Sequence, residues 1–296
     1  MKKGISFAFL TAVISGVSIF INKFAVTGVN SSVFTGLKAV IVSLFLISTL
    51  FIFKDFKELK KLTKKDYMKL FFIGLLGGSI PFLLFFKGLQ LTTALNASFI
   101  HKTMFLWVAL LAVIFLKEKL DKRWFIAAVL ILAGNILLLR ITNWSFNIGD
   151  ILILSATFFW ASENIISKQV LKKLNARTVA LGRMFFGSLV IMVYLAVIGQ
   201  ITQIATISLT NVFWILLTSI FLFFYVSSWY TALKYARAST ATSILMFGSV
   251  ITALLSFIFL EKVFVLSEIL GIILIISGSV VITLQITVIS PIKAKF

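Results

Sequence analysis

The segment Ser15-Gly16-Val17-Ser18-Ile19-Phe20-Ile21-Asn22-Lys23 is repeated later in the chain. It aligns with Trp160-Ala161-Ser162-Glu163-Asn164-Ile165-Ile166-Ser167-Lys168, and this internal repeat determines the architecture that we predict. The same offset of 145 residues aligns Lys38 with Arg183, and an offset of 144 residues aligns residues 92–98 with residues 236–242. The chain of 296 residues therefore contains two copies of one unit.

The composition is that of a membrane protein. Apolar residues make up 60% of the chain and charged residues 12%, whereas a soluble domain is about 45–50% apolar and about 25% charged. The lack of cysteine excludes disulfides, thiolate metal sites and cysteine nucleophiles, and a single histidine, His101, excludes a histidine-rich metal site. We therefore expect neither a metal nor another cofactor.

Ten segments are apolar over the roughly 20 residues that a membrane-spanning helix requires. They cover residues 5–27, 33–53, 67–90, 93–116, 124–141, 149–170, 177–199, 210–235, 237–260 and 267–289. Because each copy holds an odd number of spans, the second copy must enter the membrane in the opposite orientation. We predict an all-α integral membrane protein of ten transmembrane helices in two inverted five-helix repeats, residues 1–142 and 149–290. Inverted repeats of this kind build secondary transporters, which hold the substrate near the bilayer midplane.

The distribution of lysine and arginine predicts the orientation, because cytoplasmic loops collect positive charge. With the N-terminus inside, the cytoplasmic segments carry 19 Lys and Arg residues, and the outer segments carry only Arg140 and Lys262. The cytoplasmic segments are residues 2–3, 54–65, 117–123, 172–177, 234–237 and 293–295. We expect a multi-pass protein of the cell membrane with both termini in the cytoplasm and its basic loops against anionic lipids. Nucleic-acid binding is disfavoured because no basic domain stands free of the membrane.

Glu163 is the one acidic residue in the interior of an apolar span, where it lies beside Trp160 and Asn164. A charge at that depth costs about 2.5–3.5 kcal/mol on insertion scales, so a functional role is the first hypothesis. Glu163 can couple protons or bind the ammonium group of a substrate. Alternatively, it neutralises a lysine of a neighbouring span, such as Lys102. The sequence leaves both interpretations open.

Other polar and aromatic residues of the spans are candidates for binding. His101 and Lys102 lie near the middle of the fourth span and point about 100° apart on a helix. Lys102 is expected to face a cavity or to pair with the buried acid, and His101 either braces two helices or takes part in binding. Asn96, in a run of small residues that lets helices approach closely, and the deep Trp160 and Trp229 complete the set. Core packing is the alternative role for each tryptophan.

Four cations lie near span ends and are related in pairs by the repeat. They are Lys23 and Lys38 at the outer ends of the first two spans, and Lys168 and Arg183 at the inner ends of the sixth and seventh. One interpretation is that their side chains extend toward lipid headgroups. The other is that they form two polar gates, one at each face of the membrane.

Pro81 distinguishes the two copies mechanically. It lies within the third span, after Gly77-Gly78, and it cannot donate a backbone hydrogen bond. We therefore expect a bend in this span. The equivalent residue of the second copy is Val226, so the bend is expected in the first copy alone.

The sequence contains no motif of the Walker, G-x-S-x-G or H-E-x-x-H types. A membrane prenyltransferase-type enzyme needs clustered acids to bind Mg²⁺, and this chain has one acid within a span. No segment has the pattern of a channel filter. We therefore expect no enzyme activity, and a gradient must drive any transport.

The two copies share an ordered set of short motifs. Each fourth span begins with a small-residue run and ends with Phe115-Leu116-Lys117-Glu118 or Phe259-Leu260-Glu261, and each fifth span contains a glycine, Gly134 or Gly278. Over nearly the whole chain, this duplicated set resembles the EamA-like transporters of the drug/metabolite transporter superfamily. The resemblance implies ten helices, cytoplasmic termini, a central cavity lined by helices one, three, four, six, eight and nine, and helices five and ten at the periphery. Where the family commonly has a proline in its fourth helix, this chain has the stretch 101–104.

These observations predict a secondary transporter of small polar metabolites that works by alternating access. Buried cations outnumber buried acids, which favours a ligand with a carboxylate or phosphate, and an amino acid or related zwitterion also suits Glu163. The resemblance implies export of such compounds. The alternatives are a carrier of purely anionic metabolites and a non-transporting scaffold or lipid-interacting protein. The expected partners are the solute and membrane lipids, with the chain as a monomer or a homodimer.

Overall fold

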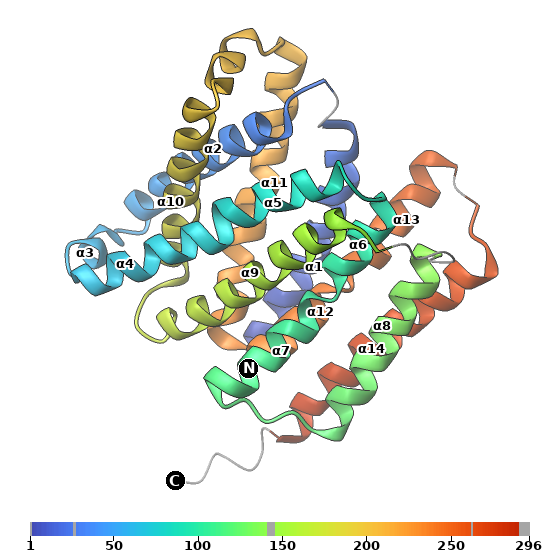
Figure 1. Cartoon of the computed structure of the whole chain (residues 1–296). Helices are drawn as coiled ribbons and strands as arrows, with labels where there is room; N and C mark the ends of the chain where they lie inside the picture. Colours follow the sequence, from blue (N-terminus) through green and yellow to red (C-terminus); the bar gives the residue numbers. More distant parts are fainter. Residues whose placement is uncertain (1, 26–27, 141–145, 262, 290–296) are drawn as a thin grey trace, which may run out of the picture.

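The computed structural model describes residues 2–25, 28–140, 146–261 and 263–289. In these ranges the chain forms helices and no strands (Figure 1). The helices of the first half are α1 (Lys2–Ala25), α2 (Ser31–Ile52), α3 (Phe56–Leu59), α4 (Lys64–Ile73), a π-helix (Gly74–Ser79), α5 (Ile80–Leu89), α6 (Ala94–Lys102), α7 (Met104–Leu116) and α8 (Lys122–Leu139). Those of the second half are α9 (Ile148–Val170), α10 (Ala176–Val197), a 3-10 helix (Gln200–Thr206), α11 (Leu209–Tyr235), α12 (Ala238–Leu245), α13 (Gly248–Leu260) and α14 (Leu266–Ile289).

Nine helical stretches within the described residues are long and apolar enough to cross a membrane. Each begins and ends within a few residues of a span that the sequence predicts; the predicted span 177–199, for example, is the helix Ala176–Val197. The predicted span 149–170 is α9, which is long enough but is not among the nine. This helix carries Asp150, Glu163 and Lys168, so its composition is less apolar than that of the others.

The helices pack in long pairs, with α8 along α14, α1 along α11, α5 along α9 and α2 along α10 (Figure 1). Glycines allow the closest approach: a methyl group on Gly134 of α8 would lie 2.7 Å from the carbonyl oxygen of Gly271 of α14. The α8–α14 pair lies at one side of the bundle in Figure 1. This is the peripheral position that the family resemblance gives to the fifth and tenth helices.

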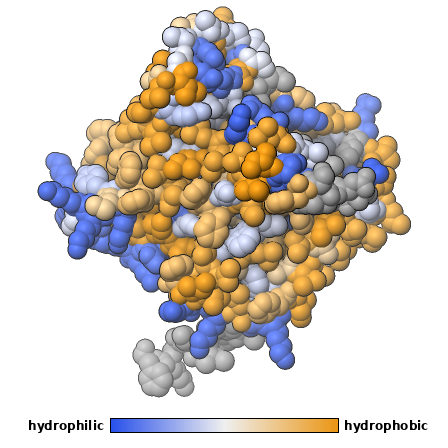
Figure 2. Space-filling model, viewed as in Figure 1, coloured by the Kyte–Doolittle hydropathy of each residue, from blue (hydrophilic) through white to orange (hydrophobic). Residues whose placement is uncertain are grey.

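The surface is suited to lipid. Large apolar side chains are exposed along most of the helices, and Figure 2 shows a broad hydrophobic belt with hydrophilic residues gathered toward its margins. Contiguous apolar patches on soluble monomers rarely exceed a few hundred Å². The chain is therefore a multi-pass membrane protein, as the composition indicates.

One end of the bundle gathers the basic connections that the charge distribution assigns to the cytoplasm. Asp55 forms an ion pair with Arg177, with Oδ2 and Nη2 2.5 Å apart, and Asp66 forms one with Lys173, with Oδ2 and Nζ 2.6 Å apart. These contacts join the connection after α2 to the first turn of α10, and the first turn of α4 to the connection between α9 and α10. Of the charges used in the orientation argument, Lys262, Lys293 and Lys295 lie outside the described residues, as does the first repeat's predicted boundary at residue 142.

Candidate functional site

The third span is interrupted near the middle of its length. The π-helix Gly74–Ser79 separates α4 from α5, and Ser79 leaves helical geometry with φ −137° and ψ −76°. Pro81 follows in the first turn of α5. Because proline has no N–H, it cannot bond the carbonyl oxygen four residues earlier, which is that of Gly77.

The carbonyl oxygen of Gly77 is bonded instead by side chains of two other helices. The indole Nε1 of Trp160, on α9, donates to it at 3.1 Å, and Nη2 of Arg183, on α10, donates at 3.0 Å. A backbone acceptor without a partner is costly in a membrane interior, where no water can replace the missing bond. The break in the third span is thus stabilised by the second half of the chain.

Glycine is required where the π-helix crosses α9 and α10, because these helices leave no space for a side chain. A Cβ atom at Gly77 would lie 2.5 Å from Cγ of Glu163, and one at Gly78 would lie 2.6 Å from the carbonyl oxygen of Arg183. Both distances are shorter than a Cβ contact tolerates. The Gly77-Gly78 pair therefore lets the broken helix come directly against the polar residues of α9 and α10.

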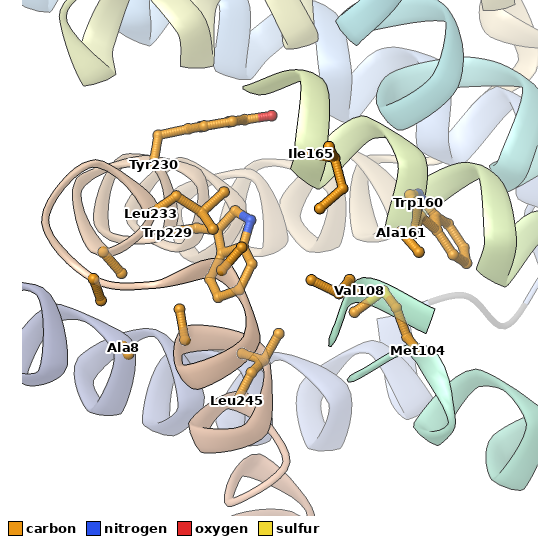
Figure 3. Close-up of a cluster of buried hydrophobic side chains, with 14 of the residues drawn as sticks. Ala8, Met104, Val108, Trp160, Ala161, Ile165, Trp229, Tyr230, Leu233 and Leu245 are labelled. Atoms are coloured by element: carbon orange, nitrogen blue, oxygen red, sulfur yellow. The ribbon is translucent and has the colours of Figure 1, made fainter. Parts of the chain in front are cut away.

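Glu163 lies at the centre of the polar cluster and is 1% exposed. Its Oε1 accepts hydrogen bonds from the Ser167 hydroxyl at 2.5 Å and from the Tyr230 hydroxyl at 2.7 Å. Tyr230 projects from α11 with its hydroxyl turned toward α9 (Figure 3). The carboxylate is therefore held by its own helix and by α11.

Arg183 supplies the positive charge of this cluster. A Cβ atom built on Gly77 would lie 2.9 Å from Cδ of Glu163 and 3.2 Å from Nε of Arg183. Cδ of Glu163 and Nε of Arg183 are therefore no more than 6.1 Å apart. Arg183 is 8% exposed, and its Nε has no hydrogen-bond partner among the described residues. We name the set of Gly77, Trp160, Glu163, Ser167, Arg183 and Tyr230 the Glu163 cluster.

A second series of hydrogen bonds connects α9 to α11 beside this cluster. Asn164 donates through Nδ2 to the carbonyl oxygen of Trp160 at 2.8 Å and accepts from Nε1 of Trp229 at 3.0 Å. The ring of Trp229 stacks on that of Tyr225, with their centroids 6.5 Å apart. Three residues predicted for binding, Trp160, Asn164 and Trp229, are thus linked to one another.

The fourth span is also interrupted, at Thr103 between α6 and α7. The ring of His101 lies edge-on to Trp160, with centroids 5.1 Å apart, and so borders the Glu163 cluster. Lys102 makes no ion pair with Glu163 in the described part of the chain, where Arg183 is the cation beside that carboxylate. Asn96 is buried near the start of α6.

The four gate candidates are placed in different surroundings. Arg183 belongs to the Glu163 cluster, and Lys168 donates to the carbonyl oxygens of Leu233 and Ala236 at 2.5 Å each, which caps the end of α11. Lys38 donates to Oδ1 of Asn22 at 2.9 Å. Lys23 is exposed at the end of α1.

The sequence did not identify Gly77, Ser167 and Tyr230 as members of the site. Ser167 follows Glu163 by four residues, a spacing that places the two on one face of a helix. Gly77 precedes Pro81 by four residues, so the freed carbonyl could also have been found from the sequence. Nothing in the apolar run around Tyr230 marks it as a partner of a distant acid.

A cavity of about 410 Å³ lies beside α6, α7 and α9 and is almost entirely apolar. Its lining is Phe99, Ile100, Thr103, Leu106, Trp107, Leu110, Phe146 and Leu154. None of these is a predicted binding residue. Within the described ranges, no group of three or more His, Asp or Glu side chains could hold a metal ion.

Comparisons with known proteins agree with this architecture. The sequence model of the EamA-like transporter family matches the chain twice, over residues 2–140 and 147–284. An uncharacterized transporter of Methanothermobacter thermautotrophicus is 28% identical over 210 residues, which are 69% of this chain and 61% of that protein, less than two thirds of its length. A protein known from a crystal structure shares the fold, with a TM-score of 0.78 and 14% identity over 95% of this chain and 98% of the other.

Proposed function

The chain belongs to the EamA-like transporter family, and from this premise we propose that it is a secondary carrier of small polar metabolites. The observation that carries the proposal is the Glu163 cluster, a buried acid and a buried cation at a break in a spanning helix. Broken helices at mid-membrane depth form the substrate and ion sites of many secondary transporters. Buried charges at such depth mark substrate or proton pathways.

The proposed architecture has ten spans, α9 included, in two inverted repeats at 1–142 and 149–290, with both termini in the cytoplasm. The two family matches begin at residues 2 and 147, 145 residues apart, which is the offset of the sequence repeat. Because the chain has no native cysteine, single cysteines report topology directly. In sealed cells, a Cys replacing Lys61 should resist an impermeant external maleimide, whereas one replacing the exposed Gln203 should react. The reverse labelling pattern would overturn the orientation.

The proposed substrate is an amino acid or a related zwitterion, carried outward. Glu163 offers a partner for an ammonium group, and the chain holds two buried cations, Arg183 and Lys38, as possible partners for a carboxylate. In the proposed cycle, protonation of Glu163 or its contact with the substrate changes the charge that Arg183 faces. That change alters the bonds at Gly77 and biases alternating access. A purely anionic metabolite is the alternative substrate class.

Counterflow in proteoliposomes tests for transport without knowledge of the coupled ion, because the gradient of the loaded solute itself drives the exchange. Purified protein is reconstituted into liposomes, loaded in turn with amino acids, organic acids or nucleosides, and assayed for uptake of the matching labelled compound. We expect counterflow for at least one carboxylate-bearing solute, and its loss or an altered pH profile in Glu163→Gln. Lys69→Met, which removes an exposed cation from the surface of α4, is the control. No counterflow across the panel would favour a non-transporting scaffold or lipid-interacting protein.

A further inference from the structure

A second polar network, in the first half of the chain, joins the buried Lys38 to two half-buried residues of α1. The Lys38 ammonium donates to Oδ1 of Asn22 at 2.9 Å, and Nδ2 of Asn22 donates to the hydroxyl of Ser18 at 3.0 Å. Lys38 comes from α2, and the other two residues lie one turn apart on α1. We name these three residues the Lys38 network.

The Lys38 network corresponds position by position to part of the Glu163 cluster. At the offset of 145 residues, Ser18 matches Glu163, Asn22 matches Ser167, and Lys38 matches Arg183. The corresponding bonds also recur: Asn22 bonds Ser18 at 3.0 Å, as Ser167 bonds Glu163 at 2.5 Å. The two halves therefore place a buried cation in equivalent positions of the fold.

The networks differ in charge. Arg183 lies beside a carboxylate, whereas the residue at the equivalent position for Lys38 is a serine. All nine acids of the chain are among the described residues, and the ion pairs found there are Asp66–Lys173 and Asp55–Arg177. Lys38 is thus a buried cation whose side-chain contacts are neutral.

The surroundings of Lys38 compensate its charge only in part. Lys38 is 8% exposed and its ammonium bonds a side chain of α1, whereas an extended interfacial lysine holds its ammonium in water or among headgroups. The ammonium lies 4.7 Å from the ring centroid of Phe34, a favourable but weak contact. An ammonium has three donor hydrogens, and Asn22 uses one of them. A negatively charged acceptor would complete this site.

We propose that Lys38, Asn22 and Ser18 bind the carboxylate of the transported solute, in the position that the Glu163 carboxylate occupies in the other copy. This inference rests on the proposed carrier function and names one part of the substrate. The solute's carboxylate is the counter-charge that the first copy lacks. The Ser18 hydroxyl can donate to it, while Asn22, whose amide nitrogen donates to the Ser18 carbonyl oxygen and hydroxyl and whose oxygen accepts from Lys38, holds these groups in place.

Four variants separate this binding site from a structural role. Ser18→Glu gives the first copy the acid of the second, so it should fill the site with an internal carboxylate. Ser18→Gln has nearly the same shape without the charge. Lys38→Met removes the cation, and Lys69→Met removes an exposed cation of another span as the control.

Thermal unfolding in a neutral detergent is measured for each variant with acetate, succinate, L-glutamate and L-alanine. Sodium chloride at equal ionic strength and L-alaninamide, which lacks a carboxylate, serve as ligand controls. We expect a carboxylate-specific rise in melting temperature for the wild type and Lys69→Met. In Ser18→Gln the rise should be smaller but should persist, because the longer side chain occupies part of the site without neutralising Lys38. In Lys38→Met the carboxylate affinity should fall at least about 30-fold, and in Ser18→Glu the rise should disappear. Without ligand, Ser18→Glu and Lys38→Met should each melt above the wild type, because the first supplies a counter-charge for Lys38 and the second removes the uncompensated charge.

Several results would overturn the proposal. The first is a carboxylate-specific rise in melting temperature that persists in Lys38→Met and Ser18→Glu. The second is the absence of such a rise in the wild type. The third is a Lys38-dependent rise that phosphatidylglycerol produces and the carboxylates do not. Equal rates of counterflow for L-alanine and L-alaninamide would also exclude the carboxylate site, while supporting the carrier function. Conversely, a Lys38-dependent carboxylate effect in a protein without counterflow would support the site and refute the carrier.

Discussion

Glu163→Gln is expected to destabilise the protein mainly through Arg183. Cδ of Glu163 and Nε of Arg183 are at most 6.1 Å apart, and both side chains are buried. At that distance, with an effective dielectric constant near 20, two unit charges attract by about 3 kcal/mol. Glutamine keeps the shape and can still accept from Tyr230, but it leaves the guanidinium without a counter-charge. We therefore expect the free energy of unfolding to fall by about 3 kcal/mol, at the lower end of the range for a broken buried pair.

A double-mutant cycle isolates this electrostatic contribution. The free energy of unfolding is measured by titration with dodecyl sulfate in mixed micelles, with tryptophan fluorescence as the signal. The cycle of Glu163→Gln with Arg183→Gln should give a coupling of about 3 kcal/mol. The control cycle with Lys102→Met should be additive within about 0.5 kcal/mol. A large coupling to Lys102 together with additivity at Arg183 would refute the assignment of Arg183 as the counter-ion.

Three further substitutions probe the same cluster. Tyr230→Phe removes a hydroxyl that donates to the Glu163 carboxylate and should lower the free energy of unfolding by about 1.5–3 kcal/mol in the same titration. Gly77→Ala should cost about 1–3 kcal/mol because its methyl group would lie 2.5 Å from Cγ of Glu163, whereas Gly36→Ala, whose nearest side-chain atom lies 3.0 Å away, should cost less. Pro81→Ala supplies an N–H that competes for the Gly77 carbonyl, so we expect slower counterflow at unchanged or higher thermal stability; an unchanged rate would show that the break is not part of the cycle.

The sequence predicted the helices well because span length and hydropathy are local properties. The interruptions inside spans were harder to place. Pro81 indicated a bend, but the π-helix lies before it, where Gly77-Gly78 meets α9 and α10. The break at Thr103 has no proline or glycine to indicate it, and the residues around it are ordinary for a helix.

The site was predictable only along a single helix. Glu163, Trp160 and Asn164 follow one another within one and a half turns of α9, so their proximity follows from helical spacing. Arg183 was assigned to a gate because it lies near the start of its span. Its long side chain instead reaches the Gly77 carbonyl, and which helices meet there depends on tertiary packing that periodicity does not encode.

The two copies have the same positions but different chemistry, and the difference has a mechanical consequence. The break that Pro81 produces lies in the first copy, whereas the side chains that bond its free carbonyl, Trp160 and Arg183, belong to the second. If the copies move against each other during transport, these bonds must move with them or break. A change of charge at Glu163 acts on Arg183, and Arg183 bonds Gly77, so the acid is coupled to the helix break through one intermediate residue. The first copy has no acid beside Lys38, so its buried cation is left for the solute to neutralise.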